Sequence, residues 1–161
     1  MEQLLFYILA AVAVIATGFA ITEKHPVHAI VYLVTSFFAL AVVFYLLSAP
    51  LVAVFEVIIY AGAIMVLFLF VIMMLDLGHP DKAWRPHLRE WWPALLLGGI
   101  VAGAVLTLAT TTPANGPAGP TPDIKAFSQA LFQKYGVAVE IISMQLLFAV
   151  VGALYLGRRR R

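Results

Sequence analysis

Five long apolar stretches dominate the chain and restrict it to one broad class of fold. Each has 18 or more mainly apolar residues, and they lie at about 4–21, 29–47, 51–75, 92–111 and 138–157. A helix rises about 1.5 Å per residue, so each stretch can cross a hydrocarbon core of roughly 30 Å. Only 11% of the 161 residues are charged, and they collect between the stretches. The sequence predicts an all-α integral membrane protein with five transmembrane helices, forming a single membrane domain over residues 1–161.

The second and third stretches are joined by only Ser48, Ala49 and Pro50. So short a connection makes these two helices antiparallel neighbours, and proline is well tolerated in the first turn of a helix. We expect a tight helical hairpin here.

Lysine and arginine are distributed unevenly over the two ends of the predicted helices. One side has only Lys125 and Lys134. The other side has eight such residues: Lys24, Lys82, Arg85, Arg89 and the four arginines at 158–161. Because cytoplasmic borders carry the excess of positive charge, we expect the N-terminus outside and the C-terminus in the cytoplasm. An arginine run placed after an apolar stretch indicates a membrane border and not a nucleic-acid site.

The predicted outer loop, about residues 112–136, has two halves of different character. Residues 112–122 are rich in proline and glycine, which predicts irregular structure. Residues 124–133 place apolar side chains at nearly helical spacing, with lysine and glutamine between them. This pattern predicts a short amphipathic helix on the outer surface or against a partner.

Glu56 is an isolated carboxylic acid within the third apolar stretch. Tyr60 follows four residues later, on the same helix face, and Gly62 comes just beyond. A carboxylate at membrane depth costs on the order of 2–3 kcal/mol, so it is a functional-site candidate by default. The third stretch is also longer than a membrane requires, and tilt or a π-bulge near Gly62 would absorb the surplus. The alternative is that Gly62 merely packs against a neighbour and Glu56 binds a polar group near the outer interface.

Glu140 is a second acid, at the predicted start of the fifth helix. A carboxylate in the first turn of a helix is stabilised by the helix dipole, which is its simplest explanation, and a part in coupling is the alternative. His25 and His28 are three residues apart across Pro26, but without an acid or thiol cluster we expect no metal site there. Trp84, Trp91 and Trp92 are expected to anchor the chain at a membrane interface.

Several kinds of chemistry are missing from the sequence. There is no cysteine, so this chain provides no thiolate ligands for an iron–sulfur cluster. No dinucleotide-binding glycine motif, P-loop or Ser/His/Asp hydrolase pattern is present. We expect this chain alone to have no catalytic centre and to bind no cofactor, metal or nucleic acid.

Four segments together resemble a known family. They are residues 25–29, 56–68, 71–75 and 131–147. The most specific of them is 56–68, with the sequence EVIIYAGAIMVLF. These segments closely resemble the subunit J family of the proton-pumping NADH:quinone oxidoreductases, respiratory complex I. The likeness extends over almost the whole chain.

The resemblance implies a small core subunit in the membrane arm of a respiratory-chain enzyme, located in the cell inner (cytoplasmic) membrane. Its partners would be subunits resembling H, A and K and the antiporter-like subunits, with FMN, iron–sulfur clusters and quinone bound elsewhere in the complex. In the family, the third helix has a π-bulge near the positions of Tyr60 and Gly62, associated with coupling of quinone reduction to proton translocation. We therefore take Glu56, Tyr60, Gly62 and Glu140 as candidates for a gated proton path.

Three alternatives stay open from the sequence. One is a related complex, such as a membrane-bound hydrogenase or a quinone-reducing complex with another electron donor. Another is a stand-alone ion carrier, although we find no repeated halves or paired interrupted helices of the kind that carriers use. The third is a purely structural or assembly role.

Overall fold

The computed structural model describes residues 2–75, 88–111 and 124–158. Trp84, one of the expected anchors, and all of the proline- and glycine-rich stretch at 112–122 lie outside these residues. The described chain forms two compact units, Met1–Thr121 and Pro122–Arg161, and each is presented by itself.

Within the described residues, five helices are long and apolar enough to cross a membrane, and they match the five predicted stretches to within about three residues. The prediction of an all-α, multi-pass membrane protein is therefore confirmed. The third span, Pro50–Met74, is one continuous helix made of three segments. The first unit contains α1 (Glu2–Thr22), α2 (Pro26–Leu46), α3 (Pro50–Phe55), η1 (Glu56–Ile64), α4 (Met65–Met74) and α5 (Leu88–Thr111).

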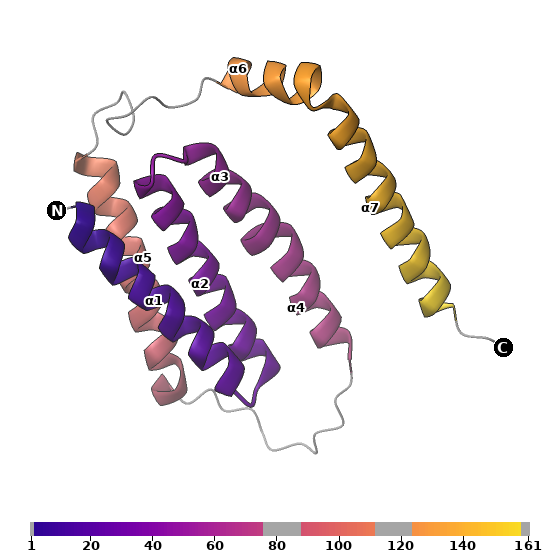
Figure 1. Ribbon diagram of the computed structural model, residues 1–161. Coiled ribbons are helices and arrows are strands. Elements are labelled where there is room, and N and C mark those ends of the chain that lie inside the picture. Colours follow the sequence, from indigo (N-terminus) through magenta and orange to yellow (C-terminus); the bar gives the residue numbers. More distant parts are fainter. Residues whose placement is uncertain (1, 76–87, 112–123, 159–161) are drawn as a thin grey trace. The chain divides into compact units, whose positions relative to one another are not determined.

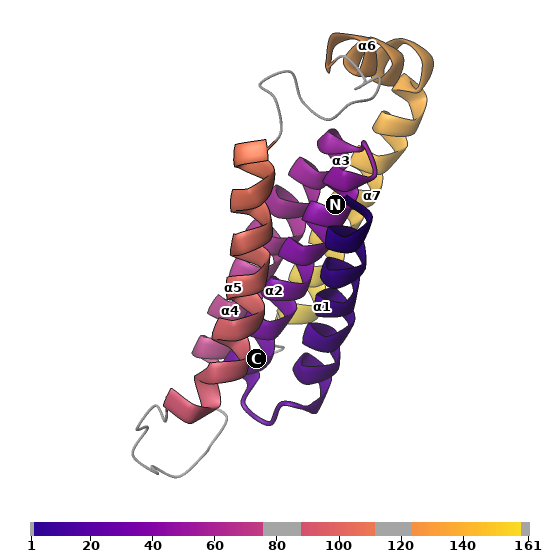
Figure 2. The same ribbon diagram turned by 90° about the vertical axis from the view of Figure 1, so that its left-hand side faces the viewer.

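α2 is the central helix of the first unit. It packs against α1, α5 and all three segments of the third span, whereas α1 also touches α5. Figure 1 shows α2 between α1 and the α3–α4 helix, and Figure 2 shows α5 along the side of this layer. The third span is thus held to the rest of the unit mainly through α2.

The core of this unit lies between α1, α2 and α5. Small residues make much of the contact surface, with Ala16 and Ala39 fully buried and Ala13 and Ala104 nearly so. Lipid tails are as apolar as the helices themselves, so membrane helices associate through close packing, which small side chains permit. Larger side chains fill the space between them: Leu9, Val12, Tyr32, Val42, Val43, Leu97 and Val101.

Both connections beside α2 are short turns. α1 ends at Thr22, and Pro26 is the first residue of α2, with the Glu23 carboxylate accepting hydrogen bonds from the Lys24 and His25 amides. At the other end of α2, Ser48 has a positive φ of 60°, and the Ala49 amide donates to the Phe44 carbonyl. This turn confirms the predicted hairpin between the second and third helices.

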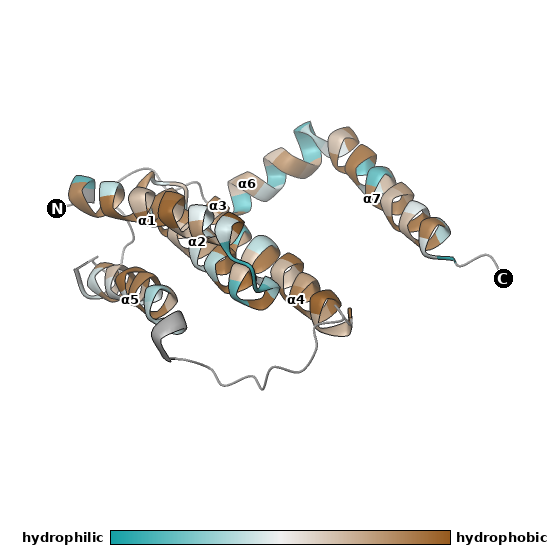
Figure 3. Cartoon of the chain, turned by 90° about the horizontal axis from the view of Figure 1, so that it is seen from below, coloured by the Kyte–Doolittle hydropathy of each residue, from teal (hydrophilic) through white to brown (hydrophobic). Residues whose placement is uncertain are grey.

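The second unit consists of α6 (Ile124–Gln129), η2 (Ala130–Lys134) and α7 (Gly136–Gly157). The first two segments confirm the predicted short helix. None of the α7 side chains is buried among the described residues, although the helix is predominantly apolar (Figure 3). A helix with apolar side chains on all faces is stable when lipid or other proteins surround it.

Candidate functional site

The third span departs from α-helical geometry over nine residues, Glu56–Ile64, which have π-helical hydrogen bonding. At the end of this segment the Met65 amide donates to the Tyr60 carbonyl, five residues back, as well as to the Gly62 carbonyl. π-Helical turns are rare and occur often at functional sites. The irregular segment begins at the only acidic residue of this span.

Three of the predicted site residues lie on this segment. Glu56 is its first residue and is half-buried, and the Tyr60 side chain is 47% exposed. Gly62 follows two residues later, and a Cβ atom there would lie 3.1 Å from the carbonyl oxygen of Val57. The structure therefore brings Glu56, Tyr60 and Gly62 together on one non-α stretch of backbone.

The third span presents a narrow buried face to its surroundings, formed by Ala53, Ala61 and Met65. Tyr60 directly precedes Ala61, and its ring contacts the ring of Phe37 on α2, with 5.6 Å between the ring centroids. The phenol of Tyr60 is thus at the edge of the contact between the third span and α2.

Glu140 belongs to the second unit, on α7, where its side chain is exposed. We expected it in the first turn of the fifth helix, but α7 begins at Gly136 and its first turn has no acidic residue. Because the effect of the helix dipole falls off within the first turn, the dipole explains this residue poorly. Its part in a proton path stays a prediction.

A polar bridge that the sequence analysis missed joins α1 to α2. The hydroxyl oxygens of Thr17 and Ser36 are 2.9 Å apart, and they lie 2.9 and 3.1 Å from the carbonyl oxygen of Ala13. One hydroxyl donates to this carbonyl while the other donates to its hydroxyl neighbour. Ser36 is almost fully buried. Serine and threonine are common in membrane helices and can bond within their own helix, so sequence alone gave no sign of this bridge.

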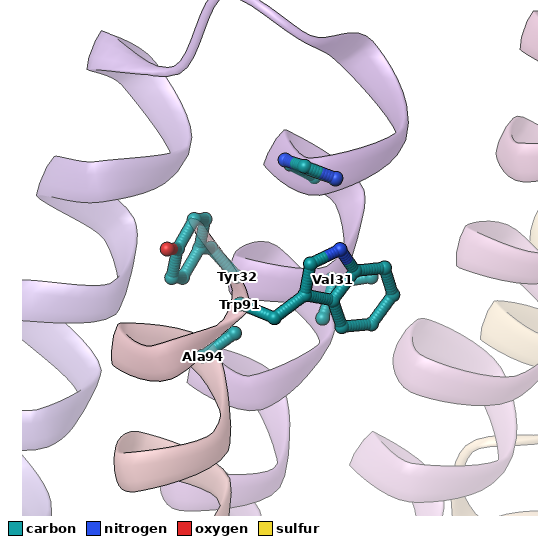
Figure 4. Close-up of a pocket in the computed structure, with 5 residues that line it drawn as sticks. Val31, Tyr32, Trp91 and Ala94 are labelled. Atoms are coloured by element: carbon teal, nitrogen blue, oxygen red, sulfur yellow. The ribbon is translucent and has the colours of Figure 1, made fainter. Parts of the chain in front are cut away.

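A small hollow lies where the start of α2 meets α5. It is lined by His28, Val31, Tyr32, Trp91 and Ala94, and it is large enough for a water molecule but too small for a quinone or nucleotide. In Figure 4 the Tyr32 side chain extends away from the indole of Trp91. The Trp91 indole packs edge-on against the His28 ring, 5.4 Å between centroids, and its buried Nε1–H has no hydrogen-bond partner.

Trp91 is half-buried, at the first residue of the span Trp91–Thr110, and its place at a membrane interface stays a prediction. Trp92 is 67% exposed, as an anchor would be. The His25 and His28 rings are 5.6 Å apart, centroid to centroid, with 58° between their planes. Within the described ranges, no group of three or more His, Cys, Asp or Glu residues comes together that would hold a metal ion.

The chemistry available on the third span is that of proton transfer. A carboxylic acid and a phenol can each release and accept a proton, and they are four residues apart on an irregular helix. In the part of the chain that the structure describes, Glu56 has no hydrogen-bonding or ionic partner from its own chain. These features define a multi-pass helical membrane protein with a titratable group on a π-helical span.

Comparison with known proteins gives the family. A family model described as NADH-ubiquinone/plastoquinone oxidoreductase chain 6 matches residues 16–156. NADH-quinone oxidoreductase subunit J of Pseudomonas aeruginosa is 42% identical over 158 residues, covering 96% of this chain and 95% of the relative. The subunit J proteins of Escherichia coli K12 and Rhodobacter capsulatus are 38% and 36% identical, covering 97% of this chain and 86% and 81% of their own lengths. The chain belongs to this family, as the resemblance had indicated.

Proposed function

We propose that this chain is a membrane-arm core subunit of a proton-translocating NADH:quinone oxidoreductase in the bacterial inner membrane. Family membership over nearly the full length supports a place in that enzyme complex, with the other subunits as partners. Subunits resembling H, A and K and the antiporter-like subunits are the neighbours we expect. The N-terminus is outside and the C-terminus is in the cytoplasm, in keeping with the distribution of lysine and arginine.

This subunit contributes no redox centre of its own. The sequence has no cysteine to ligate an iron–sulfur cluster and no nucleotide-binding motif. FMN, the clusters and the quinone are held by partner subunits. The role of this chain is therefore in coupling, and not in the transfer of electrons.

The third span is the coupling element. The π-helical segment begins at Glu56 and includes Tyr60 and Gly62, and this coincidence is the single observation that carries the proposal. Conversion of the segment between π- and α-helical pairing opens or closes a hydrated path that Glu56 and Tyr60 border. Glu140, on α7, is a further candidate for proton transfer in coupling. An element with two arrangements, biased by redox events elsewhere, is what such coupling requires.

The test uses the complete enzyme in sealed membrane vesicles. Glu56→Gln removes the titratable proton with little change of shape, and Tyr60→Phe removes only a hydroxyl. We expect both to lower proton translocation per NADH oxidised, while Tyr7→Phe, on an exposed α1 side chain, leaves it unchanged. Unchanged pumping and quinone reduction in both variants, at normal abundance of the complex, would reduce the third span to a structural role.

Purification of a tagged chain in mild detergent tests the assembly itself. Flavin- and cluster-bearing proteins in a fixed ratio to the chain would support a place in the respiratory enzyme. Purification of the chain alone would contradict it, and hydrogenase subunits in their place would identify a related complex.

A further inference from the structure

Phe37 connects the irregular third span to the rest of the first unit. Its ring lies 5.6 Å from the ring of Tyr60, centroid to centroid, with 48° between the ring planes. Phe37 is half-buried on α2, and Tyr60 is at the middle of η1. This aromatic pair joins α2 to the third span.

The helix that carries Phe37 is fastened at the preceding residue. The hydroxyl of Ser36 is hydrogen-bonded to Thr17 and donates to the Ala13 carbonyl, both on α1. α2 also packs against α5. Phe37 is therefore presented from a well-supported helix, while Tyr60 lies on the segment with the unusual hydrogen bonding.

The contact depends on the hydrogen bonding of η1. An α-helix turns about 100° per residue, and the wider π-helical turn advances less, so a return to α-helical pairing rotates all later residues by up to about 100°. Tyr60, near the middle of the nine-residue segment, would rotate by roughly half of that. A rotation of this size takes a side chain at the edge of the α2 contact out of reach of Phe37.

We infer that Phe37 is a positioning residue, whose ring contact with Tyr60 favours the π-helical form of residues 56–64 over the α-helical form. This inference rests on the proposed function insofar as it takes the segment to have two forms. It adds a residue on a different helix that sets the balance between them.

The test is single-particle imaging of the purified complete enzyme, with particles sorted by the hydrogen-bonding form of residues 56–64. Phe37→Ala should raise the ratio of α-helical to π-helical particles by about two- to tenfold, the effect of losing one aromatic pair. Phe37→Leu keeps the bulk without the ring and should act in the same direction. Phe37→Tyr keeps the ring and should leave the ratio near that of the unmodified enzyme.

Phe38→Ala is the matched control, because it removes the same side chain from the next position of α2, where it is 41% exposed. An unchanged ratio in both Phe37→Ala and Phe37→Leu, or an equal change in Phe38→Ala, would overturn the inference. If Phe37→Ala does not assemble, Phe37→Leu and Phe37→Tyr decide the question between them.

Pumping measured on the same variants separates this inference from the proposed function. A changed ratio together with unchanged protons per NADH would leave Phe37 as the positioning residue and contradict the role of the segment as a gate. An unchanged ratio in the Phe37 variants, with pumping lost in Glu56→Gln, would contradict the role of Phe37 and support the role of the third span in coupling.

Discussion

The carbonyl oxygen of Val57 lies 3.1 Å from the place where a side chain at Gly62 would begin. These two residues are five apart, the spacing that π-helical hydrogen bonds join. A Cβ atom at this distance from a backbone oxygen is tighter than ordinary van der Waals contact, so any other residue at position 62 would have to displace the Val57 carbonyl. Glycine thus suits the π-helical form, whereas alanine is the better residue for an α-helix by up to about 1 kcal/mol.

Gly62→Ala is therefore expected to favour the α-helical form of residues 56–64, by about two- to fivefold if one half to all of the helix propensity difference is realised. Gly62→Val should act more strongly, because the branched side chain crowds the same carbonyl. Protons pumped per NADH oxidised, measured in vesicles that contain the complete enzyme, should fall in the same order.

Gly99→Ala is the control for the general effect of replacing a helical glycine by alanine. It makes the same substitution in α5, where a Cβ atom would meet nothing within 4 Å in this chain. Equal pumping by the enzymes with Gly62→Ala and Gly99→Ala would show that position 62 has no special requirement for glycine.

The hydroxyl bridge between Thr17 and Ser36 should stabilise the pairing of α1 with α2. Hydrogen bonds between membrane helices contribute about 0.6 kcal/mol on average, so Thr17→Val or Ser36→Ala should shorten the half-life of the assembled enzyme at elevated temperature by about threefold. The double variant should be little worse than Ser36→Ala alone, because Ser36 takes part in both hydrogen bonds that cross from α2 to α1, one with Thr17 and one with the Ala13 carbonyl. Fully additive effects would contradict a direct interaction.

The number of helices, their boundaries and the α2–α3 hairpin could all be predicted from the sequence. Each of them depends on residues that are close together in the chain. An apolar stretch of about 20 residues has one stable form in a bilayer, and the three-residue connection at 48–50 leaves one way to join two helices. The surplus length of the third span left two possibilities open, tilt or a π-bulge, and the sequence does not decide between them. The nine-residue extent of η1 could not be predicted either, since it depends on how neighbouring helices hold the backbone.

The contacts between helices could not be predicted from the sequence pattern. Phe37 is one of 11 phenylalanines, and nothing in its surroundings in the chain marks it as the neighbour of Tyr60. The core of α1, α2 and α5 has the same difficulty, because a membrane helix carries apolar residues on its lipid-facing side as well as on its buried side. Polarity, which reveals the inner face of a water-soluble helix, gives little guidance here.

The unpaired N–H group of Trp91 should destabilise the folded protein. Its indole N–H is buried beside His28 without a partner in the described chain, and a buried unpaired donor costs about 1–3 kcal/mol. Trp91→Phe removes the donor and keeps an aromatic ring against His28, so it should leave the thermal half-life of the enzyme unchanged or lengthen it. Trp91→Ala, which empties the space, should shorten it.

Trp92→Phe is the control, because that neighbouring indole is mostly exposed. A half-life shortened by Trp91→Phe and not by Trp92→Phe would mean that the Trp91 N–H has a partner in the assembled enzyme, such as a water molecule in the hollow beside it.

The backbone conformation of Ser48, in the turn between α2 and α3, can be tested by substitution. Its φ of 60° lies in the left-handed region, which costs a residue with a side chain roughly 1–2 kcal/mol and costs glycine little. Ser48→Gly should therefore lengthen the half-life of the enzyme at elevated temperature by several-fold, and Ser48→Val should shorten it, since branched side chains tolerate this region worst. Ala49 has an ordinary φ of −114°, so Ala49→Gly gains nothing from the freedom of glycine and should give no increase. A longer half-life from Ala49→Gly but not from Ser48→Gly would show that the turn between α2 and α3 has a different backbone conformation in the enzyme.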